Sequence, residues 1–147
     1  MDFSDLLEAN AQRAGEGTPL PQRAGLAVVT CIDARVEPLS VLGLPLGEAM
    51  VVRNAGGQVT GEALAALALG VQRLGVRRVV VMQHTDCAMA ALGEDELRAA
   101  GAGALRPIPD QRARLREDVD RIRAAIPDDV LVLGTILDLR SGRLTVV

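Results

Sequence analysis

Two short polar stretches, each placed at the end of a run of β-branched residues, most constrain how this chain can fold. Residues 27–30 read Ala-Val-Val-Thr and lead into CIDAR at 31–35, while residues 79–82 read Val-Val-Val-Met and lead toward HTDC at 84–87. Runs of this kind are typical of buried parallel strands. Because open α/β folds place their sites just beyond the carboxyl ends of parallel strands, we expect both stretches to meet at one edge of a sheet.

The chain contains two cysteines and one histidine, and all three lie in these two stretches as Cys31, His84 and Cys87. Two thiolates and an imidazole form a ligand set suited to Zn²⁺. Taken singly, a buried cysteine after a strand is usually a small hydrophobic residue, and a lone histidine there is usually a polar residue with its hydrogen bonds satisfied. The sequence has no fourth cysteine or histidine, so water or Asp33 must complete a tetrahedral site. An open fourth position is typical of a catalytic zinc site.

Asp33 and Arg35 lie two residues apart and are expected to form a charge-assisted pair. Held by Arg35, Asp33 can accept a hydrogen bond from zinc-bound water or hydroxide and orient its attack. Released, it can bind the metal and block it, which predicts a pH-dependent gate. A plain structural salt bridge is the alternative for this pair. We interpret Asp86 as a helix cap, and Arg53 and Asn54 as residues that organise a loop.

Length and composition restrict the class of protein. At 147 residues the chain is expected to form one domain with its own core. The net charge is −3, and all 16 basic residues are scattered arginines, which excludes a basic nucleic-acid surface. Residues 1–5 lack the order of a secretory signal, and no uncharged run is long enough to span a membrane. We therefore expect a cytoplasmic protein with reduced thiols that contacts neither membrane nor nucleic acid.

The periodicity predicts an α/β fold, a mostly parallel four-stranded sheet flanked by helices with an antiparallel C-terminal edge strand. A pair of glycines at 56–57 is expected to let the backbone approach a ligand or the first loop closely. Thr60 is expected to cap a helix. The predicted strands cover residues 26–32, 49–53, 78–83, 130–139 and 144–147, and the predicted core helices cover 36–42, 60–74 and 111–126.

The remaining segments complete a single domain at 1–147, divided into an N-terminal arm at 2–21 and a catalytic core at 22–147. In the arm, residues 2–14 are predicted to form a helix capped by Asp2 or Ser4, and the glycines and prolines of 15–21 predict a linker. We expect a short apolar turn at 88–92 and an irregular, mobile segment at 93–109, which is rich in glycine and proline.

The motifs CxDxR at 31–35, RNAG at 53–56 and HxxC at 84–87 resemble those of the β-class carbonic anhydrases in type, order and spacing. The resemblance extends from about residue 26 to the end of the chain, including the terminal hairpin, and is greatest to the short microbial, archaeal-type branch. It implies a zinc lyase that hydrates CO₂ reversibly to bicarbonate by zinc-bound hydroxide.

The resemblance also implies one Zn²⁺ per subunit on Cys31, His84 and Cys87, with Asp33 and Arg35 as a catalytic dyad and Asp33 as a conditional fourth ligand. It implies a homodimer, or a multiple of dimers, with the N-terminal helix placed on the partner and the sites near the subunit interface. Hydrolysis of carbonyl sulfide or carbon disulfide on the same zinc site is one alternative. A catalytically silent zinc-binding dimer is the other.

Overall fold

The computed structural model describes residues 3–15, 17 and 24–147. Its sheet has the strand order β2-β1-β3-β4-β5, with β5 antiparallel to β4 and the other pairs parallel. The predicted α/β class and mixed sheet are confirmed, but the sheet has five strands rather than four, because the edge strand hydrogen-bonds directly to β4. The strands are β1 (Leu26–Cys31), β2 (Ala49–Asn54), β3 (Arg78–His84), β4 (Leu131–Leu137) and β5 (Leu144–Val146).

The two β-branched runs occupy the interior of the sheet. β1 lies between β2 and β3, and all six of its residues are buried. β3 lies between β1 and β4 and is buried over most of its length. The parallel register places Cys31 beside Asn54 and His84 beside Leu137, so the strand ends lie at one edge. The expectation that the two polar stretches meet there is confirmed.

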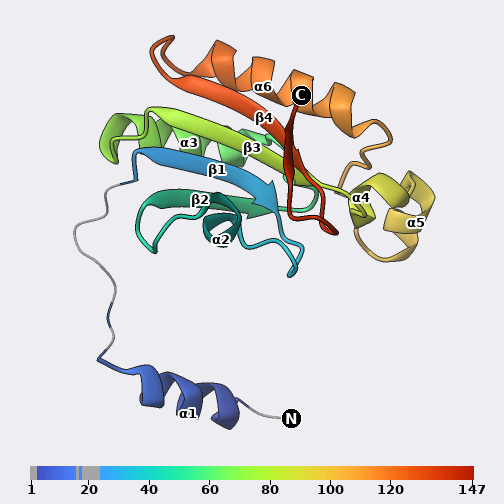
Figure 1. Cartoon of the computed structure of the whole chain (residues 1–147). Coiled ribbons are helices and arrows are strands. Elements are labelled where there is room, and N and C mark those ends of the chain that lie inside the picture. Colours follow the sequence, from blue (N-terminus) through green and yellow to red (C-terminus); the bar gives the residue numbers. More distant parts are fainter. Residues whose placement is uncertain (1–2, 16, 18–23) are drawn as a thin grey trace.

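Two long helices cover one face of the sheet, α3 (Gly61–Arg73) and α6 (Gln111–Ala125), and the short α2 (Pro38–Leu42) lies against the other face (Figure 1). Thr60 caps α3 as predicted, because its hydroxyl accepts the N–H of Ala63 at 3.2 Å. Asp110 caps α6 in the same way at 2.9 Å. Helix α6 packs against strands β3 and β4, and the predicted inward positions of the last helix are buried: Leu115, Val119, Ile122 and Ile126.

The segment between β3 and α6 is more regular than its composition predicts. It contains α4 (Ala88–Ala91) and α5 (Glu94–Ala99), so the prediction of an irregular stretch at 93–109 was wrong for its first half. The Glu96 carboxylate accepts the Gly93 N–H at 2.9 Å, and Leu97 is buried. Three acidic residues in the first turn of α5 also suit the positive end of the helix dipole.

The N-terminal helix α1 (Ser4–Arg13) matches its prediction in type but not in its cap, since Phe3 is the N-cap residue. Asp2 and, apart from Gly15 and Gly17, the predicted linker lie outside the described residues. None of the residues of α1 is buried, and Figure 1 shows this helix apart from the sheet. Among the described residues, no helix combines the length and apolar character that crossing a membrane requires.

Candidate metal centre

The structure brings Cys31, His84 and Cys87 together from the end of β1, the end of β3 and the residue that precedes α4. Their ligand atoms all lie within 4.8 Å of one another, and all three residues are buried. The two sulfur atoms are 4.0 Å apart, and both cysteines are free thiols. Two sulfurs on a tetrahedral zinc ion lie about 3.8 Å apart, given Zn–S bonds of about 2.3 Å. The spacing therefore fits a shared metal ion.

The imidazole of His84 has one nitrogen engaged and one available. Nδ1 lies 2.8 Å from the carbonyl oxygen of Thr85, which only a protonated nitrogen can pair with. Nε2 therefore carries the lone pair, and this buried atom has no hydrogen-bond partner in the described part of the chain. A buried nitrogen without a partner is costly, and a metal ion would satisfy it. Gln111 fixes the same region by donating to the His84 carbonyl oxygen at 2.9 Å.

The glycine pair after β2 comes into close contact with the first ligand loop. The N–H of Gly56 donates to Cys31 Sγ at 3.3 Å, a contact that stabilises a thiolate. Gly57 has φ +61°, and a Cβ there would lie 2.9 Å from the backbone carbonyl carbon of Thr30. Any larger residue would have to displace that backbone. The predicted close approach is confirmed, and it involves the first loop.

The Asp33 carboxylate pairs with Arg35 through both oxygen atoms. Arg35 Nε donates to Oδ1 at 3.0 Å, and Nη2 donates to Oδ2 at 2.8 Å. These side-chain hydrogen bonds, aided by the Arg35 backbone N–H, hold the pKa of Asp33 well below its usual range. Asp33 Oδ2 also lies 3.8 Å from His84 Nε2. An ionised carboxylate thus lies beside the nitrogen that is free to bind metal.

Asp86 is not a helix cap, so that interpretation was wrong. The N-cap residue of α4 is Cys87, and its side chain makes no capping bond. Asp86 instead accepts from Arg35 twice, through its carboxylate and its backbone carbonyl, each at 3.1 Å. Bonds to Asp33 and then Asp86 raise the pKa of Arg35 further above its ordinary value. Because 51 residues separate Arg35 from Asp86 and Asp86 adopts a positive φ, local sequence carries no signal for this contact.

Arg53 and Asn54 organise the surrounding loops, as predicted. Arg53 donates to the backbone carbonyls of Cys31 at 3.0 Å and Asp33 at 2.9 Å, and to that of Val36. Asn54 forms two hydrogen bonds with the backbone of Gln58, at 2.7 and 2.8 Å. These contacts fix the turn that carries Asp33 and the loop that carries Gly56.

Comparisons with known proteins agree with this geometry. The family model described as carbonic anhydrase matches residues 26–136. Beta-carbonic anhydrase 1 of Mycobacterium tuberculosis is 32% identical over 136 residues, covering 86% of this chain and 83% of the relative. The carbon disulfide hydrolase of Acidianus sp. is 27% identical over 172 residues, covering 94% and 83%. The crystal structure of carbonic anhydrase from Streptococcus mutans superposes with a TM-score of 0.85 at 34% identity, covering 100% of this chain and 98% of that one.

Proposed function

The chain belongs to the β-carbonic anhydrase family, and from that premise we propose that it hydrates CO₂ reversibly to bicarbonate with one zinc ion per subunit on Cys31, His84 and Cys87. The observation that carries the proposal is the buried cluster of three ligand atoms within 4.8 Å, one of them an unpartnered histidine nitrogen. Thiolate and imidazole are the ligands that zinc prefers, so the donor set fits the ion.

Zinc bound at this cluster supplies a water acidified enough to act as a nucleophile near neutral pH. Asp33 would accept a hydrogen bond from that water and orient it, because its Oδ2 lies 3.8 Å from His84 Nε2. Two thiolates cancel the charge of a divalent ion, so acidification of the water is weaker than with three neutral ligands. Orientation by Asp33 is therefore needed.

Arg35 determines which role Asp33 plays. While Arg35 donates to both carboxylate oxygens, Asp33 is engaged and would not itself bind a zinc ion held by the three ligands. If the pair separates, Asp33 is near enough to bind the ion itself as a conditional fourth ligand. The Asp33–Arg35 dyad is thus the proposed gate of the site.

The test is stopped-flow CO₂ hydration between about pH 6.5 and 9 on protein of measured zinc content. We expect activity that rises with pH in the wild type and a loss of both zinc and activity in Cys31→Ser. An Asp128→Asn variant serves as the control, because Asp128 lies in the exposed turn before β4. Full zinc and full activity in Cys31→Ser would contradict the ligand assignment.

Hydrolysis of carbon disulfide is the second candidate, favoured by the similarity to the Acidianus enzyme. CS₂ and CO₂ are both linear molecules with an electrophilic central carbon, so one activated water can attack either. Parallel assays with CO₂ and with CS₂ on one zinc-loaded preparation distinguish the two activities by the ratio of the two kcat/KM values. A preparation that is zinc-loaded yet inactive on both would instead indicate a catalytically silent zinc-binding protein.

We propose further that the protein assembles as a homodimer or a multiple of dimers. Three apolar side chains of the N-terminal segment are exposed, namely Phe3, Leu6 and Leu7. The sheet face opposite α3 and α6 carries a groove of about 460 Å³ at which Leu131 and Leu133 are exposed. Docking of α1 onto this groove of a second copy would bury both apolar surfaces.

Light scattering after size-exclusion chromatography tests this assembly. We expect the wild type to be dimeric or larger, and the double variant Leu6→Ser/Leu7→Ser to shift toward monomer. Leu105→Ser, a change at an exposed leucine outside both surfaces, should leave the mass unchanged. A monomeric wild type would refute the assembly.

We also place the protein in the cytoplasm, where the two free thiols stay reduced.

A further inference from the structure

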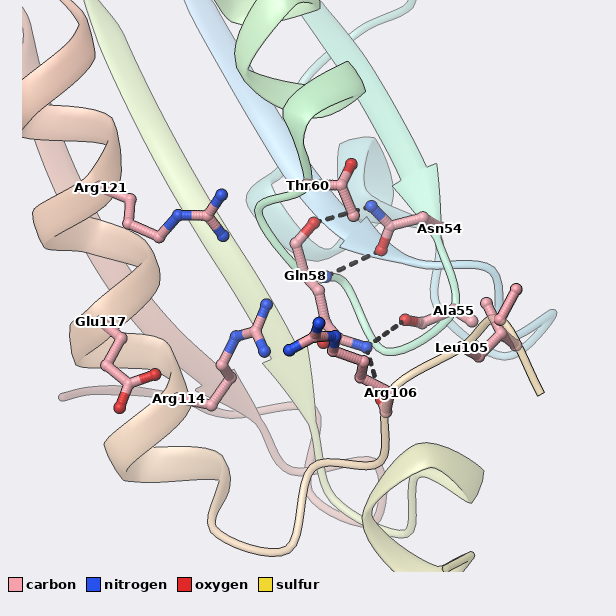
Figure 2. A pocket seen from close by; sticks show the side chains of 10 residues that line it. Asn54, Ala55, Gln58, Thr60, Leu105, Arg106, Arg114, Glu117 and Arg121 are labelled. Carbon is pink, nitrogen blue, oxygen red and sulfur yellow. Dashed lines mark hydrogen bonds between the residues drawn. The ribbon is translucent and has the colours of Figure 1, made fainter. Parts of the chain in front are cut away.

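A second cavity lies on the helical side of the sheet, and none of the three proposed zinc ligands lines it. Its volume is about 500 Å³, within the range of about 300–1,000 Å³ typical of small-molecule sites. Its walls are formed by four residues of the 54–60 loop, by residues 104–106 and by the side of α6 that faces them (Figure 2). Position and lining thus separate it from the metal centre.

Three arginines line this cavity from two sides. In Figure 2, Arg114 and Arg121 extend from α6 toward the loop opposite, and Arg106 approaches from the other wall. Arg114 Nε donates to Asp118 Oδ1 at 3.1 Å, and Arg121 donates to the carbonyl of Val59. Within the described part of the chain, the Arg106 guanidinium has neither a hydrogen bond nor an ion pair. Donors therefore remain available for a ligand.

The charges around the cavity do not cancel. Two carboxylates accompany the three guanidiniums: Glu117 lines the cavity, and Asp118 is buried behind it. Asp118 is already engaged by Arg114 and by the N–H of Val59 at 3.1 Å. Thr60, the N-cap of the thirteen-residue helix α3, also lines the cavity. The positive end of this helix dipole therefore adds to the excess of positive charge. The site is therefore electropositive.

The cavity is also held in shape before any ligand binds. Gln58 is buried, and its Nε2 donates to the carbonyls of Ala55 at 3.1 Å and Arg106 at 3.0 Å. The first bond fixes the 54–60 loop, and the second joins that loop to the 104–106 segment (Figure 2). A ligand that binds here needs to order few groups, which favours affinity.

We propose that this cavity binds a phosphate group, either as inorganic phosphate or as the phosphate of a small phosphomonoester. A guanidinium matches phosphate with paired N–H donors, and a cluster of arginines is a common way to bind it. The volume leaves room for the organic part of a small metabolite. This site goes beyond the proposed reaction, because it uses neither zinc nor the Asp33–Arg35 dyad.

Calorimetric titration of the zinc-loaded, full-length protein tests the site with two probes, inorganic phosphate and ribose 5-phosphate, at constant ionic strength. Arg106→Ala removes an unpaired positive charge and should weaken binding about threefold or more. Glu117→Gln removes a negative charge and should tighten binding by a similar factor. Arg112→Ala, at an exposed arginine of α6 that does not line the cavity, should change little.

Opposite shifts in Arg106→Ala and Glu117→Gln would support the site. Tighter binding of ribose 5-phosphate than of inorganic phosphate would identify a phosphomonoester as the ligand, and equal binding would identify free phosphate. Phosphate that coordinates zinc instead would bind all three variants equally, and that result would overturn the proposal. Absence of binding to the wild type at millimolar phosphate would overturn it as well. Neither result bears on CO₂ hydration.

Discussion

Arg35 holds Asp33 by both carboxylate oxygens, with Nε 3.0 Å from Oδ1 and Nη2 2.8 Å from Oδ2. A paired geometry of this kind fixes the orientation of the carboxylate as well as its charge. Because Asp86 also accepts from the same guanidinium, Arg35 is itself held in place. The carboxylate beside His84 is therefore positioned by contacts from two loops.

Replacement of Asp33 by asparagine should lower kcat for CO₂ hydration by about 100-fold or more, the scale measured for other oriented polar groups in active sites. The amide is neutral and can no longer act purely as an acceptor toward the nucleophile. Zinc content should stay unchanged, because the three proposed ligands are intact. Asp86→Asn is the matched control, and its kcat should fall far less than that of Asp33→Asn, since Arg35 keeps both bonds to Asp33. Wild-type activity in Asp33→Asn would contradict the proposed role.

The Asp33–Arg35 pair should also appear in the pH dependence of stability. Hydrogen bonds from Arg35 lower the pKa of folded Asp33, whereas in the unfolded chain its pKa is about 3.9. The unfolded state then binds the proton more readily, so the stabilisation is complete above about pH 4 and is lost as the pH falls toward the folded pKa.

Urea unfolding of the wild type and of Asp33→Asn at several pH values checks the direction of this pH dependence of stability. The difference in free energy of unfolding should stay constant from about pH 7 to 5 and shrink below about pH 4. A difference that grew on acidification would mean that folding raises the pKa of Asp33 instead.

Removal of zinc should change the reactivity of the two thiols. Metal-bound thiolates are shielded, so Cys31 and Cys87 should not react with a disulfide reagent while zinc is bound. After treatment with a chelator, both should react and zinc should appear in solution in equal molar amount to protein. In Cys31→Ser, Cys87 should react without chelator. Equal thiol reactivity before and after chelation would show that the cysteines do not hold the metal.

Gly57→Ala should lower the free energy of unfolding by about 2 kcal/mol or more, because strain at φ +61° adds to a contact with the backbone of Thr30. Gly142 is the matched control, since it has φ +70° but a Cβ there would meet nothing within 4 Å. Alanine there should cost only the backbone strain, about 1 kcal/mol. Urea unfolding measures the free energy of unfolding of both alanine variants. Equal decreases would show that close packing at Gly57 contributes nothing.

Local patterns predicted the scaffold well, because each element depends on residues within it. The β-branched run ahead of Cys31 predicted a strand that the structure buries completely. Thr60 followed by apolar residues predicted the start of a helix, and its hydroxyl does accept an N–H of the first turn. By contrast, α5 was missed because its glycine-rich surroundings outweighed the acidic first turn and the buried Leu97.

The sequence by itself determined that Cys31 and His84 would lie at one edge of a sheet, since each follows a strand and parallel strands end on the same side. Only the tertiary structure decided that Asp86 contacts Arg35, that Gly56 donates to Cys31, and that arginines from separate segments share a cavity. These contacts join residues distant in the chain, and their geometry depends on how loops and helices pack. Local propensity specifies the elements, whereas packing specifies which side chains meet.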